Sequence, residues 1–243
     1  MNTVVCFGDS ITRGQVSANY VKMLSGRLNR KEFHLINAGI NNDFSYNLLQ
    51  RVDVVIAEKP QVVTILIGTN DIAATLTPLN LEVGLLLKGL PRHPDPDWYR
   101  ANLLEIVQRL KAAAITHIGL ASIPVLGEDL DSPPVHIIKT YNEILKEIAG
   151  LEQTGYIPVF ERQAEYLCTH QAGSGRPYLG ELHLSVDLLA SRLLRKESYN
   201  SISRREGFAL LTDGVHMNST GAQLIARAIE SFILAATPPG GED

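Results

Sequence analysis

Short apolar runs rich in β-branched residues alternate along this chain with stretches of helical period. Five runs are typical of strands: TVVCF (3–7), FHLIN (33–37), VVTILI (62–67), HIGLAS (117–122) and GYIPVF (155–160). The third run is almost continuously apolar, as expected when both faces of a parallel sheet are covered. The alternation predicts an α/β fold, a three-layer α/β/α sandwich around a central parallel sheet of five strands.

Apolar residues recur with helical spacing between these runs. One helix is expected over 48–56, stopping before Pro60. Further helices are expected over about 98–114, 134–149 and 219–235. For the last of these, Thr220 and Gln223 form a candidate capping box at the N-terminus.

Two stretches interrupt the alternation, at about 73–97 and about 161–210. We interpret both as insertions into a single domain over 1–236, and 161–210 as a candidate lid, because insertions in α/β folds commonly form lids or substrate walls. The alternative is that they only pack on the core. The remaining residues, 237–243, are expected to form a disordered tail.

Composition excludes several classes of function. The net charge of −4 offers no basic field for nucleic acid or an anionic membrane surface. Two cysteines, Cys6 and Cys168, are too few for a disulfide framework, and without a spaced Cys/His cluster no metal site is expected. No apolar segment reaches the roughly 18 residues of a membrane span, and no secretory signal is visible, so a cytoplasmic protein is expected if Met1 is the natural start.

Four unusual polar segments fall after predicted strands or before the last predicted helix. They are GDSITRG (8–14), NAGINND (37–43), GTND (68–71) and DGVH (213–216). Ligands of doubly wound sheets bind at the carboxyl ends of the strands, so these segments are expected to meet in one site.

Ser10 follows a glycine in a strand-to-helix turn, a position that can project a hydroxyl into a cleft. By itself it is more often a helix-capping serine. A phosphate-binding loop is the other interpretation of a glycine after the first strand. The sequence lacks both G-x-G-x-x-G and G-x-x-x-x-G-K-[ST], which argues against it.

A serine nucleophile needs a base and a group that stabilises the oxyanion. Asp213 precedes His216 by three residues, which allows the carboxylate to hold one ring nitrogen while the other faces Ser10. Asn70 offers a side-chain N–H donor after a buried strand. Alternatively, Asp213 and His216 decorate a helix N-terminus and Asn70 is a turn residue.

The four segments together resemble the conserved blocks of the SGNH hydrolases, also called the GDSL lipase/acylhydrolase family. The resemblance implies a flavodoxin-like sheet, with Ser10 as nucleophile and one oxyanion donor, Asn70 as a second donor, and Asp213 and His216 completing a triad. The family usually has a glycine in the second block that donates its backbone N–H. Here Asn42 stands in its place, with Gly39 as the alternative if the loop is shifted.

The expected function is therefore that of a serine esterase or acylhydrolase, which cleaves a carboxylic ester of a small-molecule substrate through an acyl-enzyme, with no cofactor and with the acyl group left open. A carbohydrate O-acetylesterase, a thioesterase and a non-catalytic carbohydrate-binding relative remain open, as does a homo-oligomer. Two apolar segments bear on the acyl group: the Leu-rich stretch 79–90 and the face over 182–194 of a helix-like run, LHLSVDLLASRLLRK (182–196). They either shelter a long acyl chain or belong to the core or a dimer contact, and we rank the second alternative first.

Overall fold

The five apolar runs form one parallel sheet in the computed structural model, which describes residues 2–28, 32–170, 178, 180, 191 and 194–237. The strand order is β2-β1-β3-β4-β5, the order of a flavodoxin-like sheet. The strands are β1 (Asn2–Gly8), β2 (Phe33–Gly39), β3 (Val62–Leu66), β4 (His117–Ala121) and β5 (Gly155–Ile157). The predicted fold class is confirmed.

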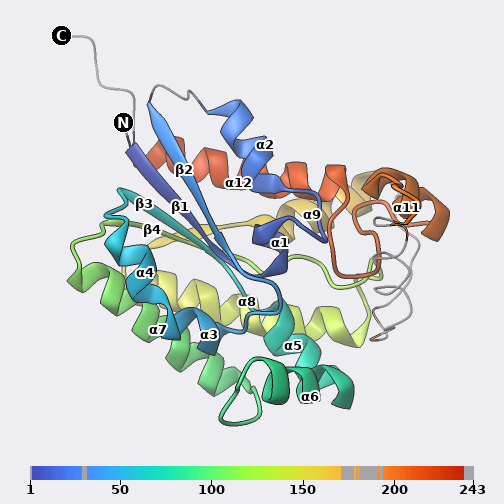
Figure 1. The fold of residues 1–243 in the computed structure, drawn as a ribbon, viewed down its shortest axis with the longest axis horizontal. Coiled ribbons are helices and arrows are strands. Elements are labelled where there is room, and N and C mark those ends of the chain that lie inside the picture. Colours follow the sequence, from blue (N-terminus) through green and yellow to red (C-terminus); the bar gives the residue numbers. More distant parts are fainter. Residues whose placement is uncertain are drawn as a thin grey trace.

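Helices cover both faces of the sheet and make the three layers (Figure 1). One face carries α1 (Ser10–Arg13), α2 (Tyr20–Arg27), α9 (Val159–Thr169) and α12 (Ser219–Ala236). The other carries α3 (Ser45–Gln50), α4 (Val52–Ala57), α7 (Pro96–Ala112) and α8 (Pro133–Leu151). Every residue of the central strand β3 is buried between these layers, which explains its continuous apolar run, whereas β2 at the sheet edge is mostly half-buried.

Three local predictions were wrong in detail. The helix expected over 48–56 is two helices, divided at Arg51, whose φ of −120° and ψ of 15° depart from the helical region. The fifth strand stops at Ile157 because Pro158, which has no N–H, begins the turn into α9. The N-cap of α12 is Asn218, whose side chain accepts from the N–H groups of Thr220 and Gly221, so Thr220 is not the cap.

The stretch 73–97 consists largely of helix. It holds the end of α5 (Thr69–Leu76), the whole of α6 (Pro78–Leu87) and a loop leading to α7. Leu90 is buried with Phe44, and Leu81 and Leu85 pack against them. Leu79, Leu86 and Leu87 are exposed. Leu81, Leu85 and Leu90 therefore belong to a small core, which is one of the alternatives expected for this stretch.

The stretch 161–210 begins within α9 and ends after α11 (Tyr199–Glu206). Part of the candidate lid, including most of the helix-like run over 182–196, lies outside the described residues. The same holds for the tail predicted at 237–243, of which only Thr237 is described.

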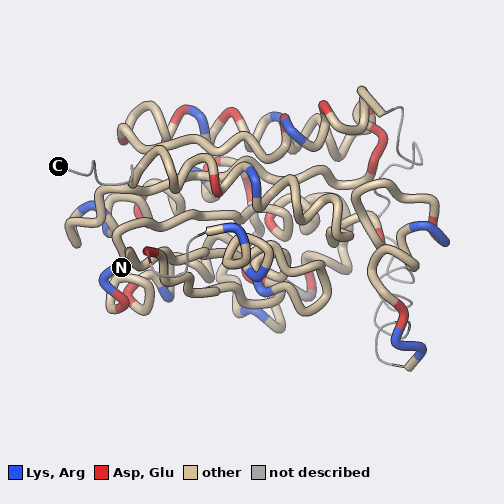
Figure 2. The backbone as a smooth tube through the Cα atoms, turned by 90° about the horizontal axis from the view of Figure 1, so that it is seen from above, with Lys and Arg blue, Asp and Glu red and all other residues tan. Residues whose placement is uncertain are grey.

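Charged residues of both signs are interspersed over the fold (Figure 2), which agrees with the small net charge. Among the helices that the structure describes, none combines the length and apolar character needed to cross a membrane. Within the same residues, no three His, Cys, Asp or Glu side chains are placed to share a metal ion.

Candidate active site

The carboxyl ends of β1, β2 and β3 lie side by side, which brings three of the four polar segments together. In the parallel register Gly8 pairs with Gly39 on one side and with Leu66 on the other. Gly8 is required there: a Cβ atom would lie 2.3 Å from the carbonyl oxygen of Leu66. Ser10 follows two residues later as the first residue of α1 and is nearly buried, with 5% of its surface exposed.

Ser10, His216 and Asp213 form one chain of hydrogen bonds. The Oγ atom of Ser10 lies 3.1 Å from Nε2 of His216. The Nδ1 atom of His216 lies 2.8 Å from Oδ2 of Asp213. The other carboxylate oxygen of Asp213 accepts the backbone N–H of His216 at 2.8 Å and that of Val215 at 3.1 Å. Asp213 therefore holds both the ring and the backbone of His216.

The electrostatics of this pair suit a general base. Burial penalises the charged form of His216, but the carboxylate of Asp213, its hydrogen bond and the charge of Asp9 outweigh burial and raise the pKa of His216. Burial alone would raise the pKa of Asp213, but the charge of His216 and the N–H donors lower it. An ionised Asp213 beside a readily protonated His216 is the arrangement that accepts a proton from a serine hydroxyl.

Asp9 lies between Gly8 and Ser10 and is also buried. Its side chain caps α1 by accepting the N–H of Ile11 at 2.9 Å. Burial raises the pKa of Asp9 to about 7, although the Ile11 N–H and His216 oppose this rise. The residue that caps α1 is therefore Asp9 and not Ser10.

The loop after β2 brings Asn42 to the same end of the sheet. Asn42 has a φ of 60°, the left-handed region that glycine prefers and that asparagine tolerates better than most residues. The N–H of Gly39, the alternative donor, is engaged by the side chain of Asn37 at 3.0 Å. Among the described residues, the N–H groups of Ser10 and Asn42 meet no acceptor.

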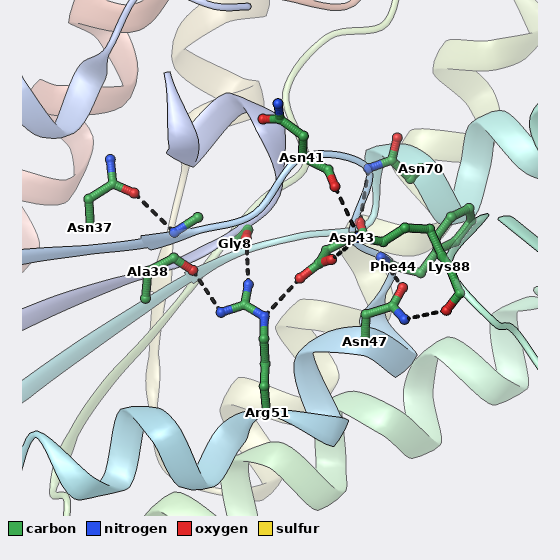
Figure 3. A network of polar contacts seen from close by, with 11 residues as sticks. Gly8, Asn37, Ala38, Asn41, Asp43, Phe44, Asn47, Arg51, Asn70 and Lys88 are labelled. Atoms are coloured by element: carbon green, nitrogen blue, oxygen red, sulfur yellow. Dashed lines mark hydrogen bonds and ion pairs between the residues drawn. The ribbon is translucent and has the colours of Figure 1, made fainter. Parts of the chain in front are cut away.

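Asn70 lies in the first turn of α5. One N–H of its amide donates to the carbonyl oxygen of Asp43 at 2.9 Å (Figure 3). That bond orients the side-chain amide and joins α5 to the loop that holds Asn42. The amide has a second N–H to offer.

Sequence reasoning missed the residues that hold these loops in place. The side chain of Asp43 contacts Arg51 and Lys88 in an ion-pair network, drawn in Figure 3. In the sequence Asp43 is only the last residue of the polar segment 37–43, and nothing in the spacing points to Lys88. Arg51 lay inside an expected helix, where a charged residue is ordinarily solvated.

Glu128, in the loop after β4, was missed as well. Its buried carboxylate accepts the backbone N–H groups of Ala209, Leu210 and Leu211 at 2.7–3.0 Å. In the same loop the N–H of Gly127 donates to the carbonyl of Gly214 at 2.8 Å. The segment that carries Asp213 and His216 is thereby held to the sheet at two points. A lone Glu in a loop gives no sequence signal of this role.

Residues 6–188 match the model of the GDSL-like Lipase/Acylhydrolase family. The esterase TesA of Pseudomonas aeruginosa is 26% identical over 167 residues, which cover 65% of this chain and 70% of TesA.

Solved structures share the fold. The acetylxylan esterase Axe2 from Geobacillus stearothermophilus matches with a TM-score of 0.64 and 22% identity, over 96% of this chain and 94% of Axe2. LAE5, described as an alpha/beta hydrolase enzyme from the metagenome of Lake Arreo in Spain, matches with a TM-score of 0.64 and 19% identity, over 97% and 94% of the two chains. At these identities the likeness is one of fold.

Proposed function

Because this chain belongs to the GDSL-like lipase/acylhydrolase family, we propose that it is a serine esterase that cleaves carboxylic esters through an acyl-enzyme. Ser10 would be the nucleophile, His216 the general base and Asp213 the group that orients it. The observation that carries the proposal is the unbroken hydrogen-bond chain from Ser10 Oγ through the imidazole of His216 to Asp213.

The mechanism follows from the order of these hydrogen bonds, from Ser10 to His216 to Asp213. His216 takes the proton of Ser10 as Oγ attacks the ester carbonyl carbon, and Asp213 stabilises the imidazolium without taking the proton itself. Collapse of the tetrahedral intermediate breaks the bond to the alcohol oxygen, which receives the proton from His216. A water deprotonated by His216 then attacks the carbonyl carbon of the acyl-enzyme. Collapse of this second tetrahedral intermediate breaks the bond to Oγ of Ser10, which takes the proton back from His216, and releases the carboxylic acid.

Three donors are candidates to stabilise the oxyanion. They are the backbone N–H groups of Ser10 and Asn42 and the side chain of Asn70. The left-handed backbone of Asn42 supports this choice, as does its N–H, which meets no acceptor among the residues that the structure describes. The N–H of Gly39 already donates to the side chain of Asn37, which argues against the alternative. Backbone donors held before the reaction begins cost no reorganisation when the negative charge develops.

A fluorophosphonate probe tests the assignment because it labels an activated serine covalently. Wild-type protein and Ser231→Ala should be labelled, whereas Ser10→Ala should not, with all three folded by circular dichroism. Ser231 is a suitable control because its hydroxyl donates to the carbonyl of Arg227 and accepts from Arg162, and neither residue belongs to the candidate active site. Labelling that survives in Ser10→Ala would exclude Ser10 as nucleophile, and an unlabelled wild type would favour a non-catalytic binding protein of the same family.

The acyl group is addressed by a panel of nitrophenyl esters of graded chain length together with acetylated sugars and thioesters. The described leucines of 79–90 are divided between a small core and exposed positions. They therefore provide no continuous apolar wall, and we expect the highest kcat/KM for short acyl groups. A steady rise in kcat/KM with chain length would contradict that expectation.

A further inference from the structure

The turn that carries the Asn42 N–H is held by an ion pair from outside its own loop. Asp43 is almost fully buried, with 3% of its side chain exposed, and its two carboxylate oxygens face different cations. Nε of Arg51 lies 2.8 Å from Oδ2, and Nζ of Lys88 lies 2.6 Å from Oδ1 (Figure 3). A carboxylate this deeply buried is stable only when paired, so both partners contribute to the position of the turn.

Arg51 is fixed on the sheet. Its Nη1 donates to the carbonyl of Ala38 and its Nη2 to the carbonyl of Gly8, both at 2.9 Å. These carbonyls lie at the ends of β2 and β1. The guanidinium also lies 4.6 Å from the ring centre of Phe7. Arg51 therefore ties Asp43 to the two strands that precede the candidate active site.

Lys88 acts on the other side of the turn, from the C-cap of α6. Besides the carboxylate of Asp43, its ammonium group donates to the carbonyl oxygen of Asn41 at 3.1 Å. Its own carbonyl accepts from the side chain of Asn47 at 2.9 Å, and Asn47 in turn accepts the N–H of Phe44 at 3.1 Å. Lys88 thus holds the residues on both sides of Asn42.

The bond from Lys88 to Asn41 has a direct consequence for Asn42. The carbonyl of Asn41 and the N–H of Asn42 belong to the same planar peptide unit, in which they point in opposite directions. A cation on the oxygen therefore fixes the direction of the N–H. It also polarises the peptide, which strengthens the N–H as a donor.

We propose that Lys88 is a positioning residue that orients the Asn42 N–H toward the oxyanion by holding the Asn41 carbonyl and the Asp43 carboxylate. The proposal rests on the esterase function proposed above. It also assigns a role to the stretch 73–97, because this segment supplies the ammonium group that completes the turn. Since Lys88 acts through Asn42, its effect should fall on the reaction step and not on ester binding.

The test is Lys88→Met compared with Lys111→Met. Lys111 is a close chemical match, because its ammonium group also bridges a carboxylate, at 2.8 Å, and a backbone carbonyl, at 2.9 Å, both of Glu152 and remote from the turn. On a short nitrophenyl ester, Lys88→Met should lower kcat about tenfold, less than the loss of a whole oxyanion donor, with KM changed less than about threefold. Lys111→Met should leave both constants within about twofold, and Lys88→Arg should recover part of kcat.

A second measurement separates orientation of the donor from general loosening of the fold. Phenylboronic acid adds to an active serine as a tetrahedral anion, so it occupies the oxyanion site while a substrate in its ground state does not. Its inhibition constant should rise in Lys88→Met by about the factor lost from kcat. Unchanged boronate inhibition, or equal kcat in the two Met variants, would overturn the proposal.

If Lys88→Met does not fold, Lys88→Gln takes its place. The same kcat, KM and boronate inhibition constant then test the proposal. The two proposals fail in different ways. A wild type without Ser10-dependent turnover would overturn the esterase function itself. A wild type with such turnover, together with an unimpaired Lys88 variant, would overturn only the role of Lys88.

Discussion

The Oγ atom of Ser10 lies 3.1 Å from Nε2 of His216, although the two residues are 206 positions apart in the chain. A direct connection between their segments maintains this distance. The N–H of Ala18 donates to the carbonyl of Met217 at 2.9 Å, and the hydroxyl of Ser17 accepts the N–H of Met217 at 3.0 Å. The segment after α1 and the segment after His216 are therefore joined by two hydrogen bonds.

Substitution Asn70→Ala should lower kcat by about 10²–10³ with a smaller change in KM, because the side chain would donate to the oxyanion only as charge develops. Asn70→Asp has nearly the same shape but accepts where Asn70 donates, so its loss should be at least as large. Steady-state kinetics on a short nitrophenyl ester measures both. A loss below threefold in Asn70→Ala would remove Asn70 from the oxyanion site.

The acid limb of kcat/KM should report the titration of His216. The imidazole must be neutral to take the proton of Ser10, so activity falls as the pH drops through the pKa of His216, which lies above its ordinary value. Asp213→Asn removes the largest influence that raises this pKa. The variant should lose kcat by a factor on the order of 10⁴, and its acid limb should move to lower pH. An acid limb that stays in place would show that another group titrates.

Asp71 should make the fold less stable as the pH rises. It is buried, and burial raises its pKa to about 6 despite the N–H and hydroxyl of Ser45, which lower it. The folded state therefore holds the Asp71 proton more tightly than the unfolded state. The resulting stabilisation is complete below about pH 4 and is lost as the pH rises through about 6.

Urea unfolding of the wild type and Asp71→Asn at about pH 4 and pH 8 measures this effect. At about 1.4 kcal/mol per pKa unit, the wild type should lose about 3 kcal/mol relative to the variant between the two pH values. An equal pH dependence in both proteins would mean that Asp71 keeps its ordinary pKa in the fold.

Glu128→Gln should destabilise the protein by about 2 kcal/mol, because an amide replaces the carboxylate that accepts three backbone N–H groups. Since those N–H groups precede Asp213, kcat should fall as well, while Glu147→Gln, on the exposed side of α8, should change neither quantity. Denaturant unfolding and kinetics on the same preparations provide the comparison. Full stability in Glu128→Gln would show that the amide satisfies this loop equally well.

The sequence alone was sufficient to predict the fold class and the strands. Every strand of this sheet is a short apolar run, and the two-sided burial of a parallel sheet makes such runs visible without tertiary information. The candidate residues Ser10, Asn70, Asp213 and His216 were also found in the sequence, because each lies in a polar segment next to a strand end or a helix start.

Element boundaries were less accurate, for local reasons. The expected helix over 48–56 breaks at Arg51, whose side chain turns back to the carbonyls of Gly8 and Ala38. The apolar run 155–160 favours a strand, but Pro158 has no N–H to donate to the sheet, so the strand ends at Ile157. The break at Arg51 depends on partners that a window of sequence does not contain, whereas Pro158 lies within the predicted run itself.

Only the tertiary structure decided what surrounds the candidate nucleophile. Lys88 and Glu128 are ordinary charged residues in the sequence, and each gains its role from backbone groups far along the chain, the Asn41 carbonyl and the Leu210 N–H. The physical reason is that a strand is specified by burial, a property that each short segment carries in its own composition. A buried charge is specified by its partners, and those partners are brought together only when the sheet has formed.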